Sequence, residues 1–134
     1  MATTTATLTL SSGDLTGDAL SLSTSATLTK ANSVTGLDQT TGVGRKTTAA
    51  VTQYVLFDGT DYTAAKSHKV YIKNTSTVSS EFATIHINAE EIGRLYAGDW
   101  LFLPWSAHDA DNDIKITPSV STTLTVEYML IFEA

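Results

Sequence analysis

Apolar and polar residues alternate with period two along most of this chain. Leu8 and Leu10 alternate with threonines near the N-terminus, and apolar residues occupy alternate positions through most of residues 19–28. Successive side chains of a β-strand point to opposite faces, so this pattern predicts strands with one apolar and one hydroxyl-rich face. Threonine suits such a half-exposed surface because it is β-branched.

Turn residues divide the chain into a series of such short strands. Asp58-Gly59 and Gly98-Asp99 are typical of turns. We therefore predict strands at residues 7–10, 19–28, 48–57, 68–73, 81–87, 94–96, 100–104, 113–117 and 122–132. Eight or nine short strands with almost no helix predict an all-β fold, an antiparallel β-sandwich or jelly roll.

Two local patterns predict more specific structures. Residues 94–96 and 100–104 are expected to form a hairpin across the Gly98-Asp99 turn. Asn88 and Glu91 match the capping pattern of one short helical turn, which Gly93 would end.

The last predicted strand, residues 122–132, shows the clearest alternation. Tyr128, Leu130 and Phe132 share one face, which we predict to be the core face. The opposite face is also apolar in the second half of this strand. This predicts burial between two layers or a contact with another subunit.

The length of the chain fits one domain, residues 1–134, with two less regular segments. Residues 1–12 are an extended arm or a frayed end. Residues 30–47 contain three glycines and few apolar residues, which predicts a long loop.

Composition and charge narrow the choice of partners. Threonine and serine together make up 37 of 134 residues, cysteine is absent, and the net charge is −6. Without a broad basic face, neither nucleic acid nor an anionic membrane is an expected partner. The N-terminal sequence has no signal-peptide pattern, and the longest apolar stretches are far too short to span a membrane.

Three short motifs partly match known ligand-binding patterns, but each lacks residues that the pattern requires. Residues 42–47 lack the glycine spacing of a phosphate-binding loop. The carboxylates of residues 109–113 alternate as in calcium loops but lack the EF-hand glycine and glutamate, so a different calcium site and a solvated acidic turn both stay open. His86 has no second histidine at Asn88 to complete a cupin-type metal site. We therefore predict a non-enzymatic protein without catalytic residues, cofactor or metal.

The C-terminal half carries a resemblance to a known group of proteins. The residues that carry it are Val70–Ser76, Arg94–Trp100, Leu103–Trp105 and Thr125–Leu130. Over residues 68–132 this sequence resembles small jelly-roll virion proteins of tailed bacteriophages, most closely capsid decoration (cement) proteins. The resemblance implies a Leu-x-x-Gly-Asp turn between two strands and a closing Val-Glu-Tyr strand.

The resemblance also implies a function. It implies a structural protein of the virion that stabilises the phage head as a homotrimer, bound to the major capsid protein or another virion protein and assembled in the host cytoplasm. The alternative is a tail, neck or fibre-associated protein that binds a host-surface glycan or another virion protein. We name five candidate interaction residues: Arg45, Lys46, Trp100, Trp105 and Tyr128.

Overall fold

The computed structural model describes residues 1–15, 17–120 and 122–134, and it is all-β. The described residues form eleven strands and two single 3-10 turns, η1 (Gly59–Asp61) and η2 (Ala110–Asn112). The strands are β1 (Thr5–Ser12), β2 (Leu20–Thr27), β3 (Gln39–Thr40), β4 (Gly44–Thr47), β5 (Tyr54–Phe57), β6 (His68–Asn74), β7 (Phe82–Ile87), β8 (Glu90–Tyr96), β9 (Trp100–Trp105), β10 (Ile114–Pro118) and β11 (Thr125–Phe132).

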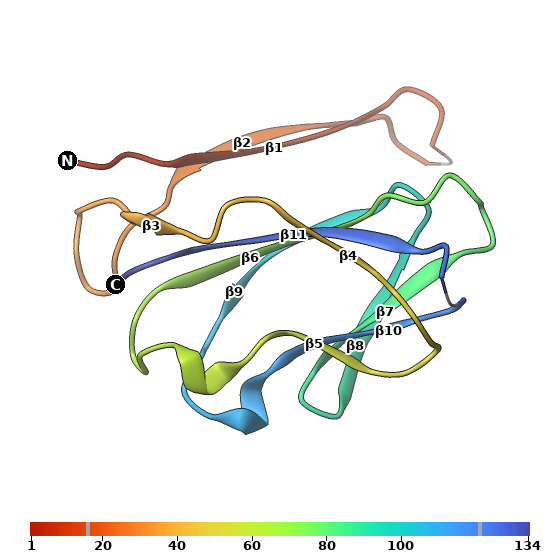
Figure 1. Cartoon of the computed structure of the whole chain (residues 1–134). Helices are drawn as coiled ribbons and strands as arrows, with labels where there is room; N and C mark the ends of the chain where they lie inside the picture. The colour runs from red at the N-terminus through yellow and green to blue at the C-terminus, as the bar shows by residue number, and fades with distance from the viewer. Residues whose placement is uncertain (16, 121) are drawn as a thin grey trace.

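Two antiparallel sheets form the body of the molecule, which is a β-sandwich (Figure 1). The first sheet has the strand order β5-β10-β7-β8. The second has the order β3-β11-β6-β9, and β4 pairs with β11 beside β3. The all-β sandwich class predicted from the sequence is therefore confirmed, and the finer jelly-roll description stays a prediction.

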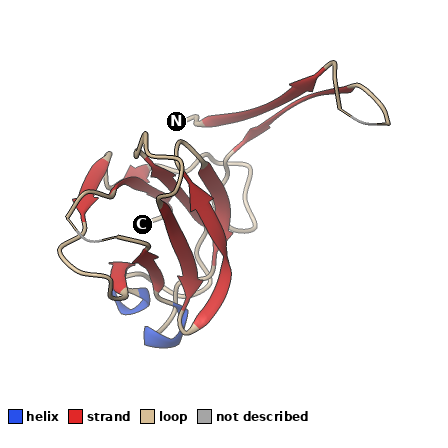
Figure 2. Ribbon diagram, turned by 90° about the vertical axis from the view of Figure 1, so that its right-hand side faces the viewer, coloured by secondary structure: helices blue, strands red, loops and turns tan. Residues whose placement is uncertain are grey.

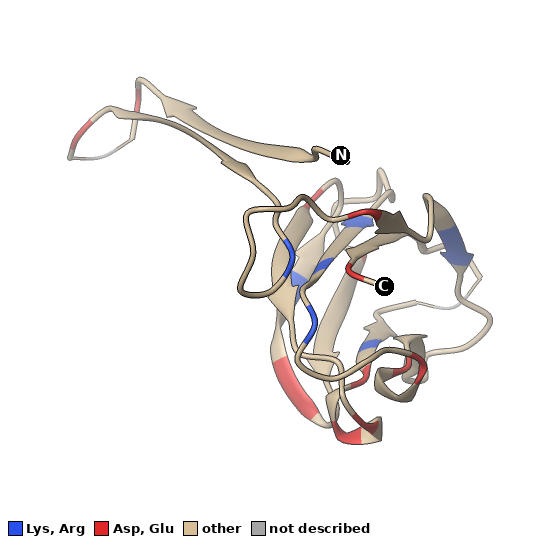
Figure 3. Cartoon of the chain, turned by 90° about the vertical axis from the view of Figure 1, so that its left-hand side faces the viewer, with Lys and Arg blue, Asp and Glu red and all other residues tan. Residues whose placement is uncertain are grey.

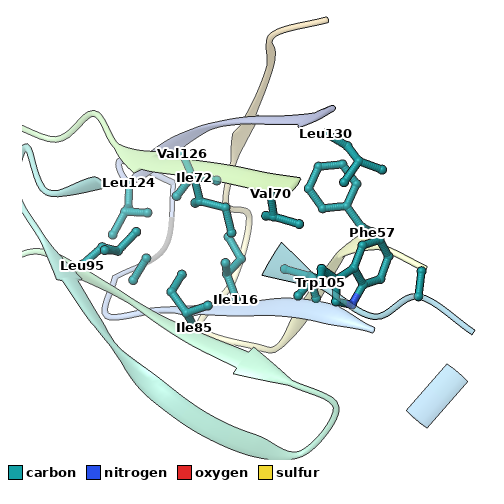
Figure 4. Packing of buried hydrophobic residues seen from close by; sticks show 13 residues of the cluster. Phe57, Val70, Ile72, Ile85, Leu95, Trp105, Ile116, Leu124, Val126 and Leu130 are labelled. Atoms are coloured by element: carbon teal, nitrogen blue, oxygen red, sulfur yellow. The ribbon is translucent and has the colours of Figure 1, made fainter. Parts of the chain in front are cut away.

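The core lies between the two sheets and follows from the alternation of each strand. Val70 and Ile72 of β6 are fully buried, while Tyr71 between them is only partly buried. Ile85 and Ile116 meet them from the first sheet (Figure 4). In β11, Leu130 is also fully buried, as the alternation predicts.

A two-stranded arm projects from this body (Figure 2). It consists of β1 and β2, and every residue of β1 pairs with a residue of β2, from Thr5 opposite Thr27 to Ser12 opposite Leu20. At its base, the backbone N–H of Leu28 donates to the carbonyl of Thr4 at 2.8 Å, and the Leu28 side chain is buried. The predicted extended segment 1–12 is thus one half of a hairpin.

The predicted loop at residues 30–47 is wrong in part, because it contains β3 and β4. Neither strand is apolar enough to be recognised from periodicity, since β4 reads Gly-Arg-Lys-Thr. Both form through main-chain pairing along the free edge of β11. These two strands account for the difference between nine predicted and eleven observed strands.

The predicted strand at residues 48–57 begins too early, because β5 starts only at Tyr54. Before it, the Tyr54 hydroxyl accepts the backbone N–H groups of Ala49 and Ala50, at 3.1 and 3.0 Å. The chain therefore turns at these alanines, and the Tyr54 side chain holds it there in place of the strand pairing that the sequence predicted.

The helical turn predicted at residues 88–91 is wrong. Asn88 and Ala89 form a tight turn between β7 and β8, with Ile87 paired to Glu90. Asn88 has a φ of 55°, in the left-handed region that asparagine tolerates well. Strand pairing on both sides outweighs the capping pattern.

The hairpin predicted across Gly98-Asp99 is also wrong, because β8 and β9 belong to different sheets. The turn instead carries the chain from one sheet to the other, and Gly98 adopts a φ of 83° there. Asn74, buried at the end of β6, secures this corner. Its amide nitrogen donates to the carbonyls of Glu81 at 3.3 Å and Leu95 at 3.0 Å.

Candidate interaction surface

The arm has two chemically different faces because its register places like residues opposite one another. One face carries hydroxyls, with Thr7 and Ser25 hydrogen-bonded at 2.8 Å. The other face is largely apolar and is formed by Ala6, Leu8, Leu10, Leu20, Leu22 and Ala26.

The apolar face is covered only near the body. Ala6 and Leu8 are partly buried, whereas Leu10, Leu20 and Leu22 further along the arm are 39–45% exposed. We call these three residues the distal leucines. Leu10 and Leu22 are direct cross-strand partners, so the three form a compact apolar patch.

A second apolar surface lies on the outer face of the second sheet. Tyr71 of β6 pairs with Phe102 of β9, and Lys73 pairs with Trp100. These four side chains alternate with more deeply buried neighbours that pack toward the core, and they therefore point away from it. Trp100 is 51% exposed, which is unusual for so large an apolar side chain.

The base of the arm and this outer face enclose a groove of about 590 Å³, which we call the arm–sheet groove. Its walls are mostly apolar. The arm contributes Ala6, Leu8, Ala26 and Leu28 together with hydroxyl residues, and the sheet contributes Tyr71, Lys73, Trp100 and Phe102. Its size is within the range of about 300–1,000 Å³ typical of small-ligand pockets.

The predicted basic residues lie in strand β4 at the edge of the second sheet, where Arg45 is opposite the outward-facing Glu127 and Lys46 is opposite the buried Val126. Arg45 is 71% exposed and pairs with Glu127 of β11 at 3.3 Å. The ammonium of Lys46 lies 5.0 Å from the centre of the Tyr54 ring, in cation–π geometry. Both side chains are exposed, so both cations are accessible to a partner.

Glu127 also connects the ion pair to the groove. It accepts a hydrogen bond from the Tyr71 hydroxyl at 3.2 Å. Burial raises the pKa of Tyr71, and the carboxylate of Glu127 raises it further. The hydroxyl therefore stays protonated and serves as a fixed donor at physiological pH.

The other two predicted residues, Trp105 and Tyr128, lie on the core side. Trp105 is only 4% exposed, and its indole N–H donates to the carbonyl of Asn112 at 2.7 Å. Tyr128 is half-buried and packs edge-on against Phe57, with ring centres 5.6 Å apart. Both are core residues, and of the five candidates only Arg45, Lys46 and Trp100 are exposed enough for a partner to contact.

The acidic segment 109–113 is used for local structure. Asp109 caps η2 by accepting the backbone N–H of Asp111 at 3.0 Å. Asp113 is buried and accepts the backbone N–H of Gly59 at 2.8 Å. His86, which lacks the second histidine of a cupin-type site, lies in β7, and its Nε2 is 3.1 Å from the Thr117 hydroxyl of β10.

The described residues contain neither a metal-binding cluster nor a membrane-spanning helix. Among residues 1–15, 17–120 and 122–134, no three His, Asp or Glu side chains lie close enough together to hold a metal ion. Within the same described ranges, no helix is long and apolar enough to cross a membrane.

Comparison of the chain with protein-family models, with curated proteins and with solved structures gave no match.

Sequence reasoning missed the distal leucines and Phe102 as surface residues. A signal for the leucines was present, since β1 and β2 contain no charged residue and alternate over most of their length. For β9, the spacing of the two tryptophans along the strand was overlooked. Trp100 and Trp105 are five positions apart, so a strand must place them on opposite faces.

Proposed function

We propose that this chain is a non-enzymatic structural protein of a tailed-phage virion, a decoration protein that binds the head as a homotrimer. The observation that carries this proposal is the projecting arm with its uncovered apolar face. A fixed body with an apolar extension is typical of proteins whose task is to hold other copies or a larger shell.

The physical argument is that the arm is incomplete by itself. A two-stranded hairpin without a third strand or a covering layer is marginally stable in water. Monomeric soluble proteins rarely expose large contiguous apolar patches, and such patches mark interaction sites. The distal leucines on the arm and Trp100 on the second sheet, all exposed, therefore favour a protein that functions in contact with a partner.

The resemblance of residues 68–132 to virion decoration proteins supports the same direction. In such an assembly, the major capsid protein or another virion protein would be the second partner. Arg45 and Lys46, exposed at the edge of the second sheet, are suited to meet acidic groups of a shell.

The arm–sheet groove favours a second candidate, a tail, neck or fibre-associated protein that binds a host glycan. Sugar rings stack on exposed aromatic side chains, and Trp100 and Phe102 offer such faces next to Lys73. This candidate uses the groove as a ligand site, whereas the first uses the surface for assembly.

The test is to locate the chain in the assembled particle. Cryo-electron microscopy of virions from the phage that encodes this gene should show the body and arm on the outer face of the head. A chain found only at the tail, neck or fibres would contradict the decoration role. A glycan array with wild-type protein and Trp100→Ala tests the second candidate, which requires a signal that the substitution abolishes.

A further inference from the structure

We propose that the distal leucines of one copy insert into the arm–sheet groove of a second copy. This inference rests on the proposed function, because it names the contact through which copies of the chain associate. It commits to one occupant for the groove, the arm of an identical chain.

The first argument is apolar complementarity. The groove is lined mainly by apolar and aromatic groups, including Leu8, Trp100 and Phe102. The distal leucines are the part of the arm that its own body leaves exposed. Seating them in the groove covers both surfaces at once and gives the two-stranded ribbon a packed layer on its apolar face.

The second argument is charge. The shaft of the arm is uncharged, and its acidic groups, Asp14 and Asp18, stand at the tip (Figure 3). On the receiving sheet, Lys69 and Lys73 flank Tyr71 two residues away on either side. The tip lies a few residues beyond the distal leucines, so leucines seated on Tyr71 and Phe102 bring an aspartate toward one of these lysines.

The third argument is reach. Eight residues per strand give the arm a length of about 26 Å. The ribbon is paired along its whole length and extends away from its own body (Figure 2). Its own groove is lined by residues near the arm base, such as Ala6 and Ala26, and not by the distal leucines. A neighbouring copy is therefore the body that the distal leucines can reach.

Such a contact joins two different patches, the arm of one copy and the groove of the next. Contacts of this kind close into rings when the rotation between copies divides a full turn. The expected homotrimer is one such ring, with each copy giving one arm and receiving one.

Disulfide crosslinking between copies tests the contact directly, because the chain has no cysteine of its own. One batch of full-length protein carries Leu22→Cys and a second, of distinguishable mass, carries Phe102→Cys. After mixing and mild oxidation, the expected product is the mixed dimer of one chain from each batch. Predominant Leu22→Cys homodimers would show arm packed on arm and would overturn the proposal.

The matched control moves the cysteine to the hydroxyl face of the same arm. Ser23→Cys lies next to position 22 in β2 and points to the opposite face. Mixed with Phe102→Cys chains under the same conditions, it should crosslink at least tenfold less. Equal yields for positions 22 and 23 would overturn the proposal, since the contact would then have no defined face.

A second measurement uses association in solution. The Leu10→Ser, Leu22→Ser double variant should associate at least tenfold more weakly in sedimentation equilibrium, because two apolar side chains lose their buried site. Thr9→Ala, Ser23→Ala changes the opposite face and should associate like wild type. An unchanged association constant for the leucine variant would overturn the inference.

Failure of this inference and failure of the proposed function are distinguishable. Crosslinked, associating copies that are absent from the phage head would leave the arm contact intact and contradict the decoration role. Chains found on the head that give no mixed crosslink would support the decoration role and overturn the arm contact.

Discussion

The body and the arm are built from the same alternating sequence pattern but obtain their stability in different ways. In the body, each apolar strand face meets the other sheet, and residues such as Val70 and Ile116 are fully buried. In the arm, the apolar face of an equally regular ladder is left largely open. Period-two alternation thus specifies a strand. It does not specify what covers the apolar face of that strand, which is another sheet in the body and is no described part of the same chain in the distal half of the arm.

The polar groups of the two regions differ in the same way. The buried amide of Asn74 in the body donates to the backbone carbonyls of Glu81 and Leu95 and is shielded from water. The hydroxyls of the arm pair across the ribbon, as with Thr7 and Ser25, and are exposed to water. We therefore expect single substitutions to destabilise the body more than the arm.

The largest expected effect is the loss of core volume in the body. Leu130→Ala should lower the free energy of unfolding by about 2–5 kcal/mol, because the side chain is fully buried and a cavity is left. Urea denaturation measures this value. A loss below about 0.5 kcal/mol would place Leu130 outside the core and would blur the distinction between body and arm.

Removing the corner amide should cost less. Asn74→Ala leaves two buried carbonyl groups without their donor, so we expect a loss of about 2 kcal/mol in the same measurement. Thr77→Ala, an exposed change nearby, is the matched control and should change stability by less than about 0.5 kcal/mol. Equal effects for the two variants would contradict the role of Asn74.

His68 makes the body sensitive to acid. It is buried among Tyr62, Trp105 and Phe132, and burial lowers the pKa of its imidazole from the ordinary value. The unfolded chain therefore takes up a proton at higher pH than the folded one. Stability is complete above about pH 7.5 and falls as the pH drops below about 6.5, by at most about 1.4 kcal/mol per pH unit.

Denaturation of wild type and His68→Phe between pH 7.5 and 5 measures this dependence. The phenylalanine variant keeps an aromatic ring at the site and cannot take up a proton. Its stability should change less with pH over this interval than that of wild type. Parallel curves would assign the acid sensitivity to other groups.

The turns of the two regions should also respond differently. Gly98 has a φ of 83°, so Gly98→Ala should destabilise the body by about 1 kcal/mol through backbone strain alone, since the space around it is open. Gly13, at the end of the arm, has equal space and no positive φ. Gly13→Ala should leave the midpoint of thermal unfolding unchanged, and a drop matching that of Gly98→Ala would contradict this account.

The smallest expected effect concerns the arm. In dilute protein, Leu22→Ser should change the unfolding free energy of the body by less than about 0.5 kcal/mol, because the side chain contributes nothing to the core. A loss comparable to that of Leu130→Ala would mean that the arm and the body form one cooperative unit. Denaturation at several protein concentrations separates this effect from loss of association.

Most of the body was predictable because apolar alternation reports burial directly. Tyr128, Leu130 and Phe132 lie on the predicted inner face of β11. What periodicity does not report is the partner of each strand. The Gly98 turn reads as a hairpin in the sequence, and only the structure shows that its two strands join different sheets.

The candidate surface was less predictable, for two reasons. Arg45 and Lys46 lie in a strand without an apolar residue, so no hydrophobic pattern in the sequence indicates that this strand pairs with β11. The leucines of residues 19–28 alternate as a core strand does, and nothing local to them shows that no second sheet lies opposite. Such information is three-dimensional, since it depends on where the remaining strands go.

The position of β11 in the second sheet sets the order in which the strands can pair during translation. β11 is translated after all the other strands, yet it lies between β6 on one side and β3 and β4 on the other. The described pairings give β3 and β4 no partner but β11, so these two strands can pair only once β11 has been made. By contrast, β1 and β2 emerge first and pair with each other locally. The nascent chain thus carries a paired arm before the second sheet is complete, because β11 joins β3 and β4 to that sheet only when synthesis has passed residue 132.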